Sequence, residues 1–78
     1  MKFKIYSRDG CPYCEKVKKV LELARLDYEE NMLNTDYSRD DFYEKFGPLA
    51  TFPRVTLNEE LIGGCTETIK YLRDKDLV

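Results

Sequence analysis

The chain has 78 residues, of which 42% are apolar and 36% are charged, and its formal net charge is −2. This length predicts a single domain, residues 1–78, with one small hydrophobic core. Acidic and basic residues are interspersed, which argues against nucleic acid as a partner. The sequence shows no secretory signal and no apolar stretch of membrane-spanning length, so we expect a cytoplasmic protein that does not bind a membrane.

The first third of the chain predicts a strand followed by a helix. The apolar run between Phe3 and Tyr6 indicates a short strand. From Pro12 onward, apolar side chains recur at helical spacing between Val17 and Ala24. Pro12 suits the first helical position, because the N–H that proline lacks would have no partner there. The helix is therefore expected to begin at Pro12.

A second strand and a second helix are predicted next. The segment LDYEENMLN, residues 26–34, is interpreted as a strand, although its alternation of apolar and polar residues is imperfect. Ser38 with Asp41 three residues later is a helix start signal, and Gly47 with Pro48 is a stop signal. A helix is therefore expected between these two signals.

The remainder of the chain predicts a hairpin and a final helix. The segments FPRVTLN (residues 52–58) and EELIGG (residues 59–64) are interpreted as two strands joined by a turn at residues 58–60. The last segment, residues 63–78, begins with two glycines and continues as a helix. The order β-α-β-α-β-β-α predicts an α/β fold, a four-stranded mixed sheet with helices on both faces.

Two of the three cysteines, Cys11 and Cys14, lie three residues apart in the first turn of the predicted helix. This spacing brings the two Cα atoms to about 5–6 Å, within disulfide geometry. A zinc site is disfavoured, because the chain has three cysteines and no histidine. A redox couple is favoured in an α/β setting. An iron–sulfur cluster shared between chains and a purely packing role are the alternatives.

The two cysteines are predicted to be unequal. Cys11 would lie at the helix N-terminus, where unpaired N–H groups and the helix dipole favour a thiolate. Arg8, three residues earlier, would add a second positive charge. Cys14 lies one turn further along, beside Val17, and would be shielded. We therefore expect Cys11 to attack substrate disulfides and Cys14 to resolve the mixed disulfide.

Three motifs together resemble the dithiol glutaredoxins of the thioredoxin-like superfamily. They are CPYC at residues 11–14, TFPRV at residues 51–55 and GGC at residues 63–65, in the order and at the spacing of that family. The resemblance covers essentially the whole chain. It implies a thioredoxin-like (glutaredoxin) fold for the predicted elements.

The resemblance also implies roles for the residues around CPYC. Cys11 corresponds to the exposed nucleophile, which takes the glutathionyl group or forms the first mixed disulfide. Cys14 corresponds to the resolving cysteine. Arg8 stands where the family carries a basic residue near the thiolate, and Pro12 supports the same thiolate.

A glutathione groove is implied beside the cysteines. From the residues alone Pro53 would be taken as an ordinary trans proline, but it matches the cis-proline of the superfamily. The backbone of Phe52 would then pair with the cysteinyl part of glutathione. The implied glutathione-binding residues are Arg8, Cys11, Tyr13, Thr51, Phe52, Pro53, Gly64, Cys65, Thr66 and Glu67.

The sequence departs from the family pattern at several places. Phe52 stands where valine is common, and no basic residue precedes Thr51 in GPLAT. Thr66 takes the first of two positions that are often acidic, so that only Glu67 is acidic. Arg25 stands where a glycine often closes the first helix. None of these departures alters the cysteine pair.

The third cysteine, Cys65, opens the final predicted helix. A small side chain packed at the start of that helix is the favoured interpretation. A regulatory thiol that is oxidised or glutathionylated under stress is the alternative.

The expected function is a glutathione-dependent thiol–disulfide oxidoreductase that reduces protein disulfides and glutathione mixed disulfides. Glutathione is the expected co-substrate, with no permanently bound cofactor and no metal. Expected protein partners are disulfide-containing proteins, with ribonucleotide reductase as a candidate, and the protein is expected to be a monomer. The alternatives are a redoxin that is reduced by thioredoxin reductase and donates electrons to ribonucleotide reductase, and a non-catalytic iron–sulfur cluster carrier.

Overall fold

Strands and helices follow the predicted order in the computed structural model, which describes residues 1–78. The elements are β1 (Phe3–Ser7), α1 (Pro12–Leu23), β2 (Tyr28–Met32), α2 (Arg39–Phe46), β3 (Arg54–Leu57), β4 (Glu60–Gly63) and α3 (Cys65–Asp74). The strands form one sheet in the order β2-β1-β3-β4. β1 pairs with β2 in parallel, whereas β3 is antiparallel to β1 and to β4. The mixed α/β sheet is therefore confirmed.

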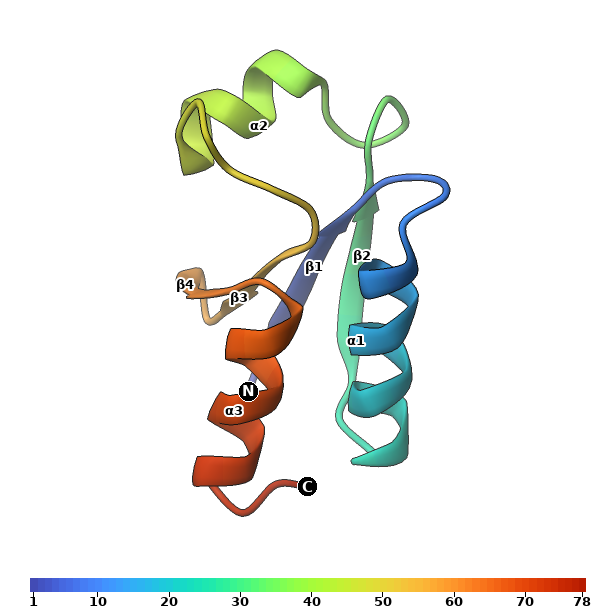
Figure 1. The fold of residues 1–78 in the computed structure, drawn as a ribbon, viewed down its shortest axis with the longest axis vertical. Coiled ribbons are helices and arrows are strands. Elements are labelled where there is room, and N and C mark those ends of the chain that lie inside the picture. Colours follow the sequence, from blue (N-terminus) through green and yellow to red (C-terminus); the bar gives the residue numbers. More distant parts are fainter.

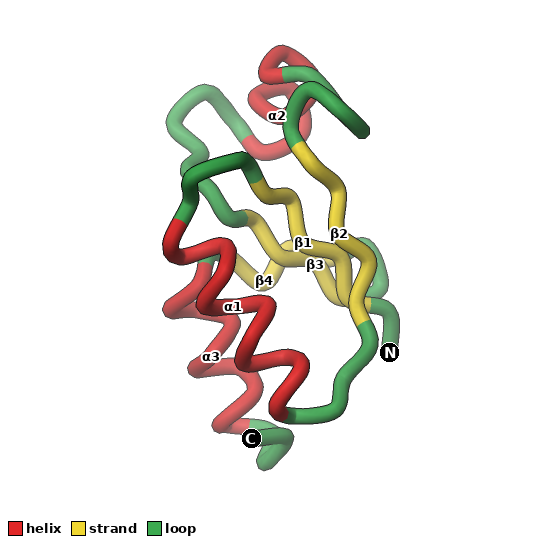
Figure 2. Tube along the Cα trace, turned by 90° about the vertical axis from the view of Figure 1, so that its right-hand side faces the viewer, coloured by secondary structure: helices red, strands yellow, loops and turns green.

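The hydrophobic core lies between the sheet and the two helices α1 and α3. These helices run side by side on one face of the sheet, as Figures 1 and 2 show. Alternate residues of β1 point toward them, and Phe3 and Ile5 are almost completely buried. The core cluster consists of Phe3, Ile5, Val17, Leu21, Val55, Cys65 and Leu72. The helical spacing in the first third of the chain thus produced the face of α1 that covers the sheet.

The shorter helix α2 covers only one end of the opposite face (Figure 2). It contacts the sheet through Phe46, whose ring centroid lies 5.0 Å from that of Tyr6. Tyr6 points away from the core because it alternates with Ile5 along β1. The rings around α2 form an aromatic cluster of Tyr6, Tyr37, Phe42, Phe46 and Phe52. Helices therefore lie on both faces, as predicted, but α2 covers only part of its face because it has only eight residues.

Several element boundaries differ from the predicted ones, and both β2 and α3 are shorter than the predicted segments at residues 26–34 and 63–78. α1 ends at Leu23, and Ala24 is its C-cap. β3 begins at Arg54 rather than at Phe52, because Pro53 has no N–H to donate to a neighbouring strand. Glu60 belongs to β4 rather than to the turn. The hairpin turn is therefore tight and centres on the two residues before Glu60.

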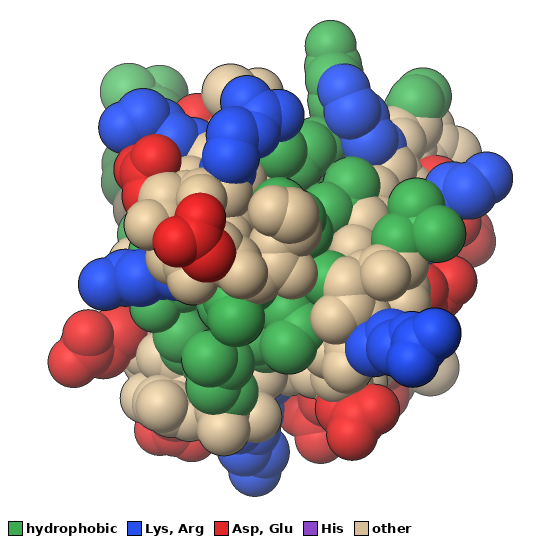
Figure 3. All heavy atoms as spheres, turned by 90° about the horizontal axis from the view of Figure 1, so that it is seen from below, with side chains coloured by type: hydrophobic (Ala, Val, Ile, Leu, Met, Phe, Trp, Pro, Cys, Tyr) green, Lys and Arg blue, Asp and Glu red, His purple; other side chains and the backbone are tan.

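The ends of α1 and α3 leave an exposed apolar surface. Figure 3 shows apolar side chains gathered on the underside of the molecule. We call this surface the lower apolar patch; it consists of Val20, Leu23, Ala24, Leu77 and Val78. Leu23 is 76% exposed. None of the helices is both long enough and apolar enough to cross a membrane.

Candidate active site

The cysteine pair lies at the start of α1, as predicted. Cys11 is the N-cap residue and Cys14 is in the first turn. Their Cα atoms are 5.2 Å apart and their sulfurs form a disulfide. The backbone N–H of Cys14 donates to the Sγ atom of Cys11 over 3.1 Å. A first-turn N–H of the helix, which would otherwise have no partner, therefore points at the sulfur of Cys11.

Cys11 is more enclosed than the resemblance implied, and Cys14 is shielded as predicted. Cys11 is 5% exposed and Cys14 is 1% exposed. The expectation of an exposed Cys11 is wrong for this oxidised form, because the N-cap position turns its side chain back over the helix. Tyr13, between the two cysteines, is 61% exposed. Cys14 is the less exposed of the two cysteines, as predicted.

Arg8 and Pro12 flank the pair in different ways. Pro12 occupies the first position of α1, as predicted. The guanidinium carbon of Arg8 lies 5.8 Å from the centroid of the Phe52 ring, and Nη1 donates to the carbonyl of Asp9. Arg8 forms no hydrogen bond with either sulfur of the disulfide. Its charge is held beside the loop that contains Phe52.

A hollow of about 200 Å³ lies beside the cysteine pair. Its lining residues are Tyr13, Thr51, Phe52, Pro53, Arg54, Gly64, Cys65, Thr66 and Glu67. We call this hollow the groove. It brings together all the implied glutathione-binding residues except Arg8 and Cys11, from segments that are far apart in the sequence. The groove also contains Arg54, which the sequence reasoning did not identify.

The loop before β3 forms one wall of the groove. The peptide bond between Phe52 and Pro53 is cis, which agrees with the implied cis-proline. The Phe52 ring stacks on Phe42 of α2, with centroids 4.1 Å apart and an angle of 11° between the rings. The aromatic ring that replaces the more common valine is therefore packed against α2, and it fastens the loop to that helix.

The start of α3 forms the opposite wall. Gly64 is the N-cap and has no side chain to fill the groove, and its N–H donates to the carboxylate of Glu67 over 2.7 Å. A Cβ atom on Gly64 would lie 3.1 Å from Nη2 of Arg54 and 3.1 Å from Oε1 of Glu67. Only glycine leaves this space open. The predicted close approach of a ligand to the backbone is therefore sterically possible at Gly64.

Arg54 is the cation of the groove. Its Nε atom donates to the carbonyl of Thr51 over 2.9 Å, and Nη2 contacts the Thr51 hydroxyl at 3.3 Å. It forms no salt bridge, and the one carboxylate of the groove, that of Glu67, accepts the N–H of Gly64 instead. A signal was present in the sequence, because Arg54 directly follows Pro53 while GPLAT lacks a basic residue before Thr51.

Cys65 is part of the core cluster and is 6% exposed. Burial raises the pKa of its thiol. A thiol that is buried and protonated is a poor nucleophile. The structure therefore favours the packing role of Cys65 over the regulatory one.

No three side chains of His, Cys, Asp or Glu come together in an arrangement that could hold a metal ion.

Comparison with known proteins identifies the family. The glutaredoxin family model matches residues 3–62. This chain belongs to the glutaredoxin family. It is a thiol–disulfide oxidoreductase, with Cys11 and Cys14 as its disulfide-forming pair. The third motif, GGC, begins just beyond the matched residues.

Relatives resemble the chain over nearly its full length. The glutaredoxin of Haemophilus influenzae is 33% identical over 78 residues, which cover 91% of this chain and 90% of the relative. The crystal structure of Francisella tularensis glutaredoxin 1 in complex with cacodylate is 35% identical. It has a TM-score of 0.80 and covers 97% of this chain and 95% of that one. The buckwheat glutaredoxin–glutathione complex is 26% identical, with a TM-score of 0.75, covering 96% of this chain and 71% of that one.

Proposed function

We propose that this glutaredoxin uses glutathione to reduce protein disulfides and glutathione mixed disulfides. The observation that carries the proposal is the groove, where Tyr13, the Thr51–Arg54 loop and the start of α3 meet beside the cysteine pair. The solved complex of buckwheat glutaredoxin with glutathione supports it.

The disulfide-bonded pair supplies the exchange chemistry. After reduction, the thiolate of Cys11 attacks the glutathionyl sulfur of a mixed disulfide, and the substrate thiolate leaves. A glutathione thiolate then attacks the sulfur bound to Cys11, which releases glutathione disulfide and restores the Cys11 thiolate. With a protein disulfide, Cys14 attacks the mixed disulfide on Cys11, and two glutathione molecules reduce the resulting Cys11–Cys14 bond.

The first turn of α1 favours the thiolate of Cys11. The N–H of Cys14 already donates to this sulfur, and an ionised acceptor makes such a hydrogen bond stronger. The helix dipole acts in the same direction. Cys14 has a lower exposure and receives no such bond, so it is suited to resolving rather than attacking.

The groove matches the charges of glutathione, which has two carboxylates and one ammonium group. We propose that Arg54 binds one carboxylate, since it forms no salt bridge within the protein. The start of α3 would bind the other carboxylate through backbone N–H groups. Arg54 would thereby replace the basic residue that is missing before Thr51. The backbone of Phe52 would pair with the extended tripeptide as a strand does.

Glutathione-coupled reduction of a small mixed disulfide tests this proposal. We expect Cys11→Ser to abolish turnover and Cys14→Ser to retain most of it, because only Cys11 is needed for a glutathionyl transfer. Reduction of a protein disulfide should be lost in both variants. Equal activity of the two variants on the small substrate would contradict the assignment of roles.

A third variant, Arg54→Gln, tests the groove. We expect KM for glutathione to rise about tenfold, because a charge-assisted hydrogen bond contributes about 1.5 kcal/mol.

Reduction of the wild-type protein by thioredoxin reductase, without glutathione, would support the redoxin alternative. Iron bound to freshly purified protein, with absorbance in the visible range, would support the cluster carrier.

A further inference from the structure

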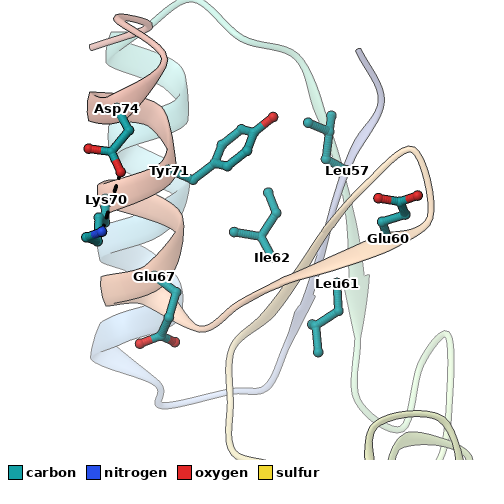
Figure 4. Close-up of a pocket in the computed structure, with 8 residues that line it drawn as sticks. All are labelled: Leu57, Glu60, Leu61, Ile62, Glu67, Lys70, Tyr71 and Asp74. Carbon is teal, nitrogen blue, oxygen red and sulfur yellow. Dashed lines mark hydrogen bonds and ion pairs between the residues drawn. The ribbon is translucent and has the colours of Figure 1, made fainter.

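A second and larger hollow lies on the outer side of α3. It has a volume of about 390 Å³ and is formed by α3 and the β3–β4 hairpin (Figure 4). Its lining residues are Leu57, Glu60, Leu61, Ile62, Glu67, Lys70, Tyr71 and Asp74. Leu57, Ile62 and Tyr71 pack against the core, so they form a fixed apolar floor. We call this hollow the edge hollow.

The edge hollow lies along an unpaired sheet edge. β4 is the last strand of the sheet and pairs only with β3. Its other side therefore presents backbone N–H and C=O groups that another extended chain can pair with. Leu61, in the middle of β4, is 51% exposed. A strand added beside β4 would place alternate side chains over the apolar floor.

The rim of the edge hollow is acidic. It contains three carboxylates, of Glu60, Glu67 and Asp74, and one ammonium group, of Lys70. Lys70 contacts Asp74 at 3.5 Å, while Glu60 forms no salt bridge. This one-sided charge favours a partner that carries Lys or Arg beside its apolar side chains.

The edge hollow lies next to the groove beside the cysteines. Glu67, in the first turn of α3, lines both. A polypeptide whose cysteine reaches Cys11 through the groove can therefore continue past Glu67 and along β4. A small disulfide or glutathione itself would fill only the groove.

We propose that the edge hollow binds the segment that flanks the reactive cysteine of a protein substrate. The segment is extended, pairs with β4, and presents an apolar side chain to the floor and a basic one to the rim. This proposal rests on the proposed function, because it adds a substrate class to the same cysteine pair. The edge hollow would make the protein select among polypeptides while small disulfides react without it.

Two peptides of about ten residues, long enough to span about 30 Å when extended, test the proposal. Each is supplied as a symmetric disulfide dimer joined through its one cysteine, so that Cys11 attacks the sulfur of the peptide itself. One alternates Lys and Val on both sides of its cysteine, and the other has Glu in place of Lys. We expect wild-type protein to prefer the basic peptide by about tenfold in kcat/KM at low salt, which corresponds to about 1.4 kcal/mol. The variants Glu60→Lys and Leu61→Ser should lose most of this preference, with turnover of the small mixed disulfide unchanged.

Two control variants carry matched changes elsewhere on the surface. Glu44→Lys repeats the charge reversal on the exposed side of α2, and Leu23→Ser repeats the apolar-to-polar change on the lower apolar patch. Both should keep the preference of the wild type. Equal losses in the β4 variants and in these controls would overturn the proposal, as would equal turnover of the two peptides by the wild type.

A binding measurement separates this proposal from the glutathione chemistry. The basic peptide with serine in place of cysteine should shift the backbone amide resonances of β4 in a nitrogen–proton spectrum. If wild-type protein fails to turn over the small mixed disulfide, the proposed function fails while these shifts still support the edge hollow. Absence of shifts in β4, or a dimer that buries β4 and excludes the peptide, would overturn it.

Discussion

The helices α1 and α3 lie side by side and point the same way, so their N-termini meet near the groove (Figure 1). They end alike. The N–H of Leu26 donates to the carbonyl of Leu21 after α1, and the N–H of Leu77 donates to the carbonyl of Leu72 after α3. Both bonds span six residues, and in each case a leucine folds back toward the core.

The two helices begin differently. At α1 the sulfur of Cys11 accepts an N–H of the first turn, whereas at α3 the carboxylate of Glu67 accepts the N–H of Gly64. At α1 the capping atom is thus also the reacting atom. At α3 the N-cap has no side chain, and the space in front of the helix is left for a ligand. One helix start serves the chemistry and the other shapes the groove.

The largest expected difference between the two starts concerns the glycines that precede them. Gly63 has φ 140°, and a Cβ there would lie 2.7 Å from Cβ of Glu67. Gly10 has φ 68°, and a Cβ there would meet nothing within 4 Å. We expect Gly63→Ala to lower the free energy of unfolding by about 2–4 kcal/mol and Gly10→Ala by about 1 kcal/mol.

Urea unfolding of both variants measures this difference. The φ of Gly10 lies close to the left-handed helical region, whereas the φ of Gly63 lies well outside it, so the excess at Gly63 reports greater backbone strain together with the contact with Glu67 of α3. Equal losses in the two variants would show that the crowding at the start of α3 is relieved at no cost.

A smaller difference concerns how each helix is held to its surroundings. Nζ of Lys18 in α1 lies 2.8 Å from Oε2 of Glu30 in β2, and the Ser7 hydroxyl of β1 donates to the same oxygen. The hydrogen bond from Lys18 lowers the pKa of Glu30, against the opposing effect of burial. The ion pair of α3, between Lys70 and Asp74, lies within the helix and is exposed.

The lowered pKa of Glu30 has a defined consequence for stability. Its contribution is present above the pKa of an unfolded glutamate, about 4.3, and is lost as the pH falls through the lower folded value. We expect Glu30→Gln to lower the free energy of unfolding by about 1 kcal/mol at neutral pH, and this effect to shrink steadily as the pH falls below about 4. Glu29→Gln is the control, because Lys4 is 3.8 Å from Glu29 and that pair is more exposed. Unfolding curves at a series of pH values measure this dependence. An effect of Glu30→Gln that does not change with pH would show that the ionised carboxylate of Glu30 does not stabilise the fold.

The smallest expected effect tests the similarity of the two helix ends. Arg25 after α1 has φ 58° and Asp76 after α3 has φ 56°, in the left-handed region where glycine is favoured. Aspartate tolerates this region better than arginine. We therefore expect Arg25→Gly to raise the free energy of unfolding by about 0.5 kcal/mol and Asp76→Gly by less. Thermal unfolding of both variants checks this, and a loss of stability in Arg25→Gly would show that its side chain contributes more than its backbone costs.

Much of the fold was accessible from local patterns. The order of elements followed from the spacing of apolar residues and from two helix start signals. These signals were Pro12 in α1 and the Ser38–Asp41 capping box before α2, and the structure contains both. The boundary at Arg54 and the partial cover by α2 did not follow, because strand pairing and helix docking depend on contacts between distant segments. The ion pair of Lys18 with Glu30 could not be predicted for the same reason, because Lys18 lies in α1 and Glu30 lies in β2.

The sequence by itself determined the cysteine pair and its position at a helix start, because both depend on residues only a few positions apart. Through its three motifs it also indicated most residues of the groove. Only the tertiary structure decided how these residues meet: it placed Arg54 opposite Gly64, stacked Phe52 on Phe42 and set the groove and the edge hollow on either side of Glu67. Such contacts arise where strands and helices from different parts of the chain pack together, and no local pattern encodes that packing.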